Sequence, residues 1–274
     1  MITGRTRVFA VAGHPIAHSQ SPTLHNAWFA HHGVDGVYVA LDVAPDHTGA
    51  IVDAMRHLGI AGVNLTIPHK RNIIPMLDAL TPAASAVGAV NVVFRDGQRL
   101  IGDNTDVGGL ARCLTGPSSP QGRSVVVLGA GGAGRAAAAA VAGLGASRVT
   151  VLNRTLDAAA AVARDLAPTW PGSAFTADAL TPEAFAAAAP ALVIVATAGA
   201  ADEQIATLPL EVVDADGTWC DINYWRSSDR FEPVQRAGIR WMDGRGMLLH
   251  QAALAFERFT GISPDCALAA PLLR

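Results

Sequence analysis

The sequence predicts an α/β protein with two domains, each organised on a mostly parallel sheet. The first observation is that strand-like apolar runs alternate with helix-like segments along most of the 274-residue chain. The second is a glycine cluster at 125–135, where an apolar run, a tight turn and an alanine-rich helix follow one another as in a dinucleotide-binding βαβ unit. We therefore expect a first domain at 1–106, joined by a helical return at 245–274, and a dinucleotide-binding domain at 107–244.

The first domain begins with an apolar run at 7–12, which predicts a buried strand, and continues with a polar loop at 13–22. Pro22 follows Ser21 and marks a helix start, so a helix is expected at 23–32. Four residues of this helix are expected to share a face: Leu24, Ala27, Trp28 and His31. The remaining predicted elements are a strand at 37–43, a helix at 45–58, a strand at 62–67 and a hairpin that turns at Asp96-Gly97.

In the second domain, a linker helix at 108–114 precedes the glycine cluster. The apolar strand at 125–128 leads into an alanine-rich helix, and the next strand is expected at 148–152. Further strands are predicted at 173–176, 192–196, 219–221 and 239–241. The last apolar segment, 247–259, predicts a helix that returns to the first domain, because the second sheet is complete before it begins.

Composition and charge exclude several classes of protein. Half of the residues are hydrophobic and 16% are charged, as in a globular chain, and the net charge of −3 gives no electrostatic footprint for nucleic acid or an anionic membrane. The three cysteines are far apart, so we expect a reducing cytoplasm and neither a disulfide framework nor a zinc site. The nine histidines form no His-x-x-x-His pair with an acidic partner, so no metal site is expected. We expect no signal peptide and no membrane span, since Pro190 interrupts the long alanine-rich segment at 184–201.

The glycine cluster predicts where a dinucleotide diphosphate binds. Amide N–H groups at the start of a helix bind anions, and glycines let a diphosphate approach the backbone. The following strand ends at Asn153 and Arg154, where an NAD site usually carries an acidic residue; an arginine accepts a 2′-phosphate that a carboxylate would repel. The sequence therefore predicts a Rossmann domain that binds NADP. Two alternatives stay open: an S-adenosylmethionine site at the same glycines, and Arg154 as a solvated charge at a strand end.

Polar residues gather at the predicted strand ends of the first domain. They are Ser19, Ser21, Asn64, Thr66, Lys70, Asn91, Asn104 and Asp106. Each alone is typical of a turn or a helix cap, but together their hydroxyl and amide groups suit a small polyhydroxylated acid. Lys70 is the candidate for stabilising the charge that hydride addition leaves on a ketone oxygen, with Asp106 orienting it. The proximity of Asp106 favours a charged lysine, whereas burial opposes it.

Six ordered motifs resemble those of the shikimate dehydrogenase family and extend over nearly the whole chain. They are Gly-His-Pro-Ile-Ala-His-Ser-Gln-Ser-Pro at 13–22, Asn-Leu-Thr-Ile-Pro-His-Lys at 64–70, Gly-Ala-Val-Asn at 88–91, Gly-Asp-Asn-Thr-Asp at 102–106, the glycine loop with Asn-Arg-Thr at 153–155, and Gly-Arg-Gly-Met-Leu-Leu-His-Gln at 244–251. The resemblance implies a cytoplasmic oxidoreductase that uses NADPH to reduce 3-dehydroshikimate to shikimate, a step on the route through chorismate to aromatic amino acids.

The resemblance also implies roles for individual residues. Lys70 is implied to be the catalytic group and Asp106 its partner. The substrate carboxylate is implied to contact Ser19, Ser21 and Tyr224, and the ring hydroxyls Thr66, Asn91, Asp106 and Gln251. The cofactor is implied to contact Gly129, Ala130, Gly131, Gly132, Ala133, Asn153, Arg154 and Thr155, with Ile222 and Gly244 near the nicotinamide.

The chain departs from the usual pattern of the family at Val92, Val107, Ala158, Val195 and Arg226. These departures remove no proposed catalytic group, but they leave quinate and aminoshikimate dehydrogenation open as alternatives. A non-catalytic nucleotide-binding module is a third alternative, and the intact pair of Lys70 and Asp106 argues against it. As partners we expect a small-molecule substrate, no nucleic acid and no membrane, with the chain acting as a monomer or homodimer.

Overall fold

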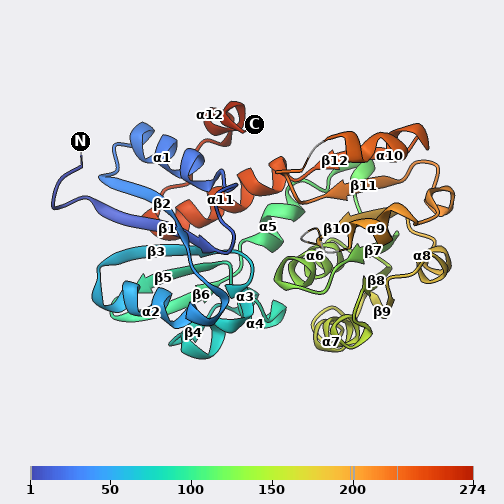
Figure 1. The fold of residues 1–274 in the computed structure, drawn as a ribbon, viewed down its shortest axis with the longest axis horizontal. Coiled ribbons are helices and arrows are strands. Elements are labelled where there is room, and N and C mark those ends of the chain that lie inside the picture. Colours follow the sequence, from blue (N-terminus) through green and yellow to red (C-terminus); the bar gives the residue numbers. More distant parts are fainter. Residues whose placement is uncertain (1, 198, 200, 227, 274) are drawn as a thin grey trace. The chain divides into compact units, whose positions relative to one another are not determined.

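The computed structural model describes residues 2–197, 199, 201–226 and 228–273. The chain divides into two compact units, one formed by Met1–Gly109 with Leu248–Arg274 and the other by Leu110–Met247. Each unit contains its own sheet with helices beside it (Figure 1). The α/β class predicted from alternating strands and helices is confirmed.

The sheet of the first unit has the strand order β2-β1-β3-β5-β6-β4. Its strands are β1 (Arg7–Gly13), β2 (Gly36–Asp42), β3 (Ile60–Leu65), β4 (Ala79–Leu80), β5 (Val92–Asp96) and β6 (Arg99–Asp103). Strands β1, β2 and β3 are parallel, and β4 is parallel to β6, whereas β5 runs antiparallel to both β3 and β6. The predicted hairpin at Asp96-Gly97 joins β5 to β6, and because β5 also runs antiparallel to β3 the sheet is mixed.

An aromatic core joins helices from both ends of the chain within the first unit. The helices are α1 (Ser21–His31), α2 (Thr48–His57), α3 (His69–Asn72), α4 (Pro82–Val87), α5 (Asp106–Ala111), α11 (Arg245–Thr260) and α12 (Cys266–Ala269), of which α5 and α11 cross a boundary between the units. Phe256 of α11 packs against Trp28 and Phe29 of α1, with ring centroids 5.6 and 5.3 Å apart. The predicted return of the last long helix to the first unit is therefore confirmed.

The sheet of the second unit is parallel throughout and has the order β12-β11-β10-β7-β8-β9. Its strands are β7 (Ser124–Leu128), β8 (Arg148–Asn153), β9 (Ala174–Ala179), β10 (Leu192–Val195), β11 (Thr218–Asp221) and β12 (Arg240–Asp243). Its helices are α6 (Gly132–Gly143), α7 (Leu156–Leu166), α8 (Pro182–Ala188), α9 (Asp202–Ala206) and α10 (Glu232–Arg236). The apolar run of β7 is fully buried, as expected for a central strand covered on both faces.

The buried face of α1 differs from the predicted one. Ser21, Leu24, His25, Trp28 and Phe29 are buried, at the i, i+3, i+4, i+7 and i+8 spacing of a single helix face. The histidine at position 31, which we placed on that face, is exposed. The four residues do share one stripe of the helix, but the buried face is turned away from Ala27 and His31 toward His25 and Phe29, whose rings contact each other.

The predicted helix at 45–58 consists of two elements, the 3₁₀ turn η1 (Pro45–His47) and α2. The hydroxyl of Thr48 donates to the carbonyl oxygen of Pro45 at 3.3 Å and closes that turn before α-helical bonding begins. Further 3₁₀ turns are η2 (Ile74–Met76), η3 (Gly116–Ser118), η4 (Leu210–Val212), η5 (Ser228–Phe231) and η6 (Ala270–Leu272).

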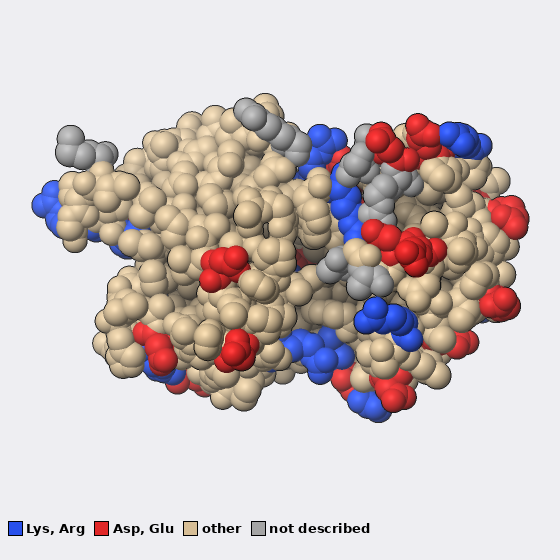
Figure 2. Space-filling view, in the orientation of Figure 1, with Lys and Arg blue, Asp and Glu red and all other residues tan. Residues whose placement is uncertain are grey.

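Charged side chains of both signs are interspersed on the face drawn in Figure 2, and tan, uncharged surface covers most of the first unit there. This distribution matches the small net charge of −3. Among the described residues, no helix has both the length and the apolar character that crossing a membrane requires.

Candidate active site

The mixed topology of the first sheet brings several predicted polar residues to one edge. Asn64 lies at the end of β3, and its register partner in β5 is Val92, which directly follows Asn91. Val92 in turn pairs with Asp103 at the end of β6. We expected all these residues at the ends of parallel strands; Asn91 instead precedes an antiparallel strand, and the reversal of β5 places its start at the same edge.

Lys70 and Asp106 form a buried ion pair at this edge. The Nζ atom of Lys70 donates to Oδ2 of Asp106 at 2.5 Å, and their side chains are 12% and 5% exposed. Lys70 lies in α3, directly after β3, and Asp106 is the first residue of α5. The backbone carbonyl of Lys70 also accepts a hydrogen bond from Val90 N at 2.8 Å, which holds the lysine beside the segment that leads into β5.

Asn91 connects the other predicted polar residues around this pair. Its Nδ2 donates to Oδ1 of Asp106 at 2.7 Å, and its Oδ1 accepts from the backbone N of Thr105 at 2.7 Å. The same amide nitrogen lies 3.3 Å from Oε1 of Gln251 in α11. Asn104 accepts from the backbone N of Asp106 at 3.1 Å and thereby fixes the first turn of α5. The structure thus brings Lys70, Asn91, Asp106 and Gln251 together, as the sequence motifs predicted.

Close backbone approaches at two glycines make room for this arrangement. A Cβ atom on Gly109 would lie 2.7 Å from Cβ of Gln251, so α5 and α11 can meet only where a side chain is missing. A Cβ atom on Gly13 would lie 2.2 Å from the methyl group of Thr66. Thr66 therefore lies directly beside the end of β1.

The residues predicted to bind a substrate carboxylate belong to both units. Ser21 is buried, and its backbone N lies 3.4 Å from the hydroxyl oxygen of Ser19. Tyr224 belongs to the second unit, where its ring packs edge-on against Trp225 with centroids 5.1 Å apart. Its contact with the substrate stays a prediction.

Sequence reasoning missed several residues that support this site. His69 is buried beside Lys70, with one ring nitrogen 2.8 Å from the hydroxyl of Thr48 and the other 2.9 Å from the carbonyl oxygen of Val43. Tyr38 is buried as well, and its hydroxyl donates to Oδ1 of Asn64 at 2.7 Å. These partners come from loops and strands distant in sequence, so local patterns carry no signal for them.

The glycine loop of the second unit has an open backbone and a close strand–helix approach. A Cβ atom on Gly134 would lie 2.0 Å from the carbonyl oxygen of Gly129, which has a φ of 115°. By contrast, a Cβ atom on Gly131 would meet no atom within 4 Å. Gly131 is the N-cap residue of α6 and provides no side-chain cap, so the first amides of this twelve-residue helix are free of capping by their own N-cap residue.

The other residues predicted for the cofactor lie at the ends of three strands of the second sheet, β8, β11 and β12. Oδ1 of Asn153 accepts from the backbone N of Ala130 at 3.3 Å, which ties the end of β8 to the glycine loop. Arg154 follows at an exposed position. A Cβ atom on Gly244 would lie 2.2 Å from the carbonyl oxygen of Ile222, so the two residues predicted near the nicotinamide are direct neighbours. Their roles toward the cofactor stay predictions.

Three family models match the sequence of this chain. They describe a shikimate dehydrogenase substrate binding domain at 11–93, a shikimate / quinate 5-dehydrogenase at 111–207, and a shikimate 5′-dehydrogenase C-terminal domain at 244–267. A curated relative, the shikimate dehydrogenase (NADP(+)) of Exiguobacterium sibiricum, is 41% identical over 267 residues, which cover 97% of each protein. The chain belongs to the shikimate dehydrogenase family.

Solved structures agree with this membership. A shikimate 5-dehydrogenase from Thermus thermophilus, in complex with NADP(H) and shikimate, is 34% identical with a TM-score of 0.82, and the match covers 98% of each chain. The 5-ketofructose reductase of a Gluconobacter species is 28% identical with a TM-score of 0.82, covering 99% of each chain. Proteins with this fold therefore include one named for a different substrate.

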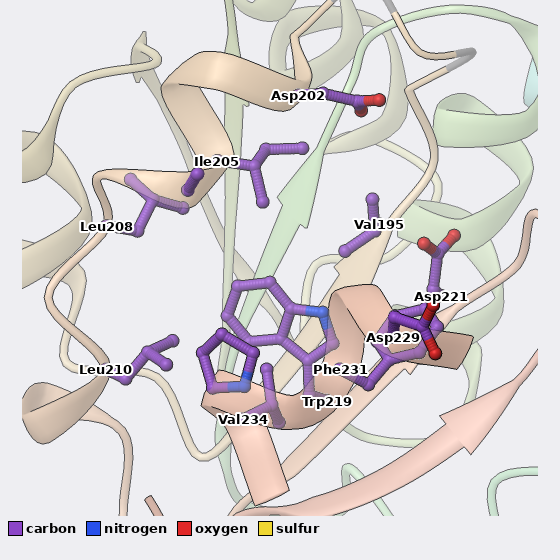
Figure 3. Close-up of a pocket in the computed structure, with 12 residues that line it drawn as sticks. Val195, Asp202, Ile205, Leu208, Leu210, Trp219, Asp221, Asp229, Phe231 and Val234 are labelled. Carbon is purple, nitrogen blue, oxygen red and sulfur yellow. The ribbon is translucent and has the colours of Figure 1, made fainter. Parts of the chain in front are cut away.

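One departure from the family pattern lines a cavity of about 310 Å³ in the second unit. Figure 3 shows Ile205 and Leu208 on one side of this cavity, with the Trp219 ring and Val195 opposite them. Val195 is buried in an apolar core cluster. The described lining contains none of the residues predicted to contact the cofactor.

A second departure, Arg226, has a buried side chain that forms an ion pair with a residue lining this cavity. Its Nη1 donates to Oδ1 of Asp202 at 2.9 Å and lies 3.9 Å from Oδ2 of Asp221, while its own side chain is 8% exposed. Its Nη2 donates to the carbonyl oxygen of Thr197 at 3.4 Å. Arg226 therefore links α9 to the ends of β10 and β11. Among the described residues, no group of three histidine, cysteine or acidic side chains is placed to hold a metal ion.

Proposed function

We propose that this chain catalyses the reversible, NADP-linked reduction of 3-dehydroshikimate to shikimate. The buried pair of Lys70 and Asp106 carries the proposal, because a binding role alone does not require an ammonium and a carboxylate 2.5 Å apart in a largely buried site. Family membership supports it, since the curated relative is named shikimate dehydrogenase (NADP(+)) and the Thermus thermophilus shikimate 5-dehydrogenase was solved in complex with NADP(H) and shikimate. The surrounding amides of Asn91 and Gln251 are suited to substrate hydroxyl groups.

In this mechanism the chain supplies the proton and stabilises negative charge. Reduction of a ketone leaves negative charge on its oxygen, and the ammonium group of Lys70 stabilises that charge most strongly in the transition state. Asp106 accepts one of the three N–H groups of Lys70, which fixes Nζ and leaves the others for the substrate. Asn91 donates to the second oxygen of Asp106, so that carboxylate is held at both oxygens.

The residues of the second unit fit a dinucleotide cofactor. The backbone at Gly131 is open, and the first amides of α6 lie directly beyond it, as a diphosphate requires. We assign Gly129, Ala130, Gly131, Gly132 and Ala133 to the diphosphate, Asn153, Arg154 and Thr155 to the ribose and its 2′-phosphate, and Ile222 and Gly244 to the nicotinamide. The chemistry that NADP(H) supplies when bound is hydride transfer.

The substrate assignment extends to the first unit. We assign Ser19, Ser21 and Tyr224 to the carboxylate of the substrate. The hydroxyl and keto oxygens attached to its ring are assigned to Asn64, Thr66, Asn91, Asp106 and Gln251. A hydroxyl-binding site of this kind strongly rejects an analogue that lacks the hydroxyl, because its polar groups are then left unpaired.

The compartment and assembly are also part of the proposal. We propose the cytoplasm, because the three cysteines are free thiols and none is placed in a Cys-x-x-Cys pair. Burial, with a contribution from Asp243, raises the pKa of Cys113 to about 11, so this thiol stays protonated and unreactive at neutral pH. In this setting the enzyme acts in aromatic amino acid biosynthesis as a monomer or homodimer.

The test is the initial rate of NAD(P)H formation with shikimate or quinate as donor and NADP or NAD as acceptor. Fast turnover with shikimate and NADP alone supports the proposal in full. A preference for quinate or NAD would leave the role of the catalytic pair unchanged but would assign the protein to another branch of the family. No rate with any combination, from protein that binds NADP in a titration, would favour the non-catalytic module.

A further inference from the structure

The amide group of Asn64 has a fixed orientation in the first unit. Its Oδ1 accepts a hydrogen bond from the hydroxyl of Tyr38 at 2.7 Å, and its Nδ2 lies 3.2 Å from the backbone carbonyl oxygen of Asn91. Because the carbonyl oxygen of Asn91 can only accept, the amide nitrogen of Asn64 lies toward it and Oδ1 lies toward Tyr38, whose hydroxyl donates. The amide nitrogen, which has two N–H groups, is thereby directed to the edge that carries Asn91.

Tyr38 is itself held by two consecutive residues of α1. The side chain of Asn26 accepts from the backbone N of Tyr38 and donates to its carbonyl oxygen, both at 2.9 Å. The ring of His25 stacks on the Tyr38 ring with centroids 4.2 Å apart and planes 7° from parallel. The backbone and the ring of Tyr38 are therefore both fixed by contacts that do not involve its hydroxyl group.

We propose that Tyr38 is a positioning residue for substrate binding, acting through Asn64. This rests on the proposed function, in which Asn64 contacts a ring oxygen of the substrate. With Oδ1 turned toward the Tyr38 hydroxyl and one N–H directed to the carbonyl oxygen of Asn91, Asn64 has its second N–H to offer to the substrate. It therefore selects a hydroxyl or carbonyl oxygen at the position it contacts and disfavours an ammonium group there, which has no lone pair to offer.

The geometry distinguishes this role from ordinary core packing. Ring packing of Tyr38 is provided by His25 and needs no hydroxyl. The hydroxyl contributes a hydrogen bond to a residue that is buried and lies at the edge occupied by the catalytic pair. Removing the hydroxyl alone thus isolates the proposed role, since the ring and its stacking are kept.

The test is a double-mutant cycle with Tyr38→Phe and Asn64→Ala, assayed with shikimate and NADP. We expect Tyr38→Phe to raise the KM for shikimate about tenfold, the scale of one buried hydrogen bond, with kcat changed less than about threefold and the KM for NADP within about twofold. In the Asn64→Ala background, Tyr38→Phe should change kcat/KM less than about twofold, because the residue it orients is gone. Effects that multiply, or a normal KM in either single variant, overturn the proposal.

Controls separate positioning from folding and from the proposed function. Thr150→Val removes the hydroxyl hydrogen bond of a buried threonine, to the exposed Thr176 at 2.9 Å, and should leave the KM for shikimate unchanged. A direct readout is exchange of the Asn64 side-chain amide protons with solvent, measured by NMR, which should accelerate in Tyr38→Phe. If the wild type lacks turnover, the proposed function fails by itself, while unchanged amide exchange would refute the role of Tyr38 independently.

Discussion

Burial of His25 makes the free energy of unfolding depend on pH, and the size of this dependence can be calculated. Its side chain is fully buried, and neither ring nitrogen has a hydrogen-bond partner among the described residues. The rings that pack around it belong to Trp28, Phe29, Tyr38, Phe256 and Phe259. Desolvation in these surroundings lowers the pKa of His25 from 6.5 to about 3.

The sign of the effect follows from proton linkage. Below pH 6.5 the imidazole of His25 binds a proton in the unfolded chain but stays neutral in the folded protein. The free energy of unfolding therefore falls as the pH is lowered toward 3. Well inside this window the loss is about 1.4 kcal/mol per pH unit. Integrated from pH 7 to pH 5, the two pKa values give a loss of about 2 kcal/mol from this one residue.

The assay is urea unfolding of the wild type and of His25→Leu at pH 7, 6 and 5. The variant loses the stack on Tyr38 at every pH, so the informative quantity is the pH dependence of the difference in free energy of unfolding between the two proteins. We expect the wild type to lose about 2 kcal/mol more than the variant between pH 7 and pH 5. His47→Leu, which replaces an exposed imidazole, should keep the wild-type slope. Parallel curves for wild type and His25→Leu would show that His25 takes up its proton inside the folded protein, contrary to this reasoning.

The remaining predictions concern the catalytic pair and the cofactor residues. Lys70→Ala should lower kcat by roughly two or more orders of magnitude with a much smaller change in substrate affinity, and near-normal turnover would remove Lys70 from the mechanism. Arg154→Ala should weaken NADP about tenfold more than NAD; equal losses in a binding titration would argue against a 2′-phosphate contact. Gly134→Ala should destabilise the protein by about 2 kcal/mol in thermal or urea unfolding, because its methyl group meets the carbonyl oxygen of Gly129. Gly131→Ala is the matched control, with open space around the methyl group: its stability should be unchanged, and a similar loss would contradict this account.

Local sequence patterns predicted the elements that are long and strongly patterned. The run ending at Leu128, with the glycines that follow it, predicted β7 and α6 because both its composition and its order are distinctive. The two-residue strand β4 has no periodicity to detect, and the short helices α9 and α10 contain too few apolar residues to show one. Pairing direction was the harder problem, since the reversal of β5 depends on long-range hydrogen bonds that no local pattern encodes.

The same distinction holds for the candidate site. Lys70, Asn91 and Asp106 could be named from the sequence because their residue types suit the chemistry and stand in recognisable motifs. Their supporting residues could not, because Tyr38 and His69 have no local pattern that marks them as partners of polar groups. The structure adds which hydrogen-bonding atoms of these side chains already have a partner within the protein.

That occupancy explains how a buried ion pair is tolerated at this edge of the sheet. Burying Lys70 and Asp106 costs desolvation energy, which their mutual attraction offsets only if the remaining polar atoms are also satisfied. One oxygen of Asp106 accepts from Lys70 and the other from Asn91, while the oxygen of the Asn91 amide accepts from the backbone of Thr105. The carboxylate is therefore paired at both oxygens within the protein, while Lys70 keeps two N–H groups beyond the one that Asp106 accepts. The network thus holds the site in one geometry while leaving its donor group available to a substrate oxygen.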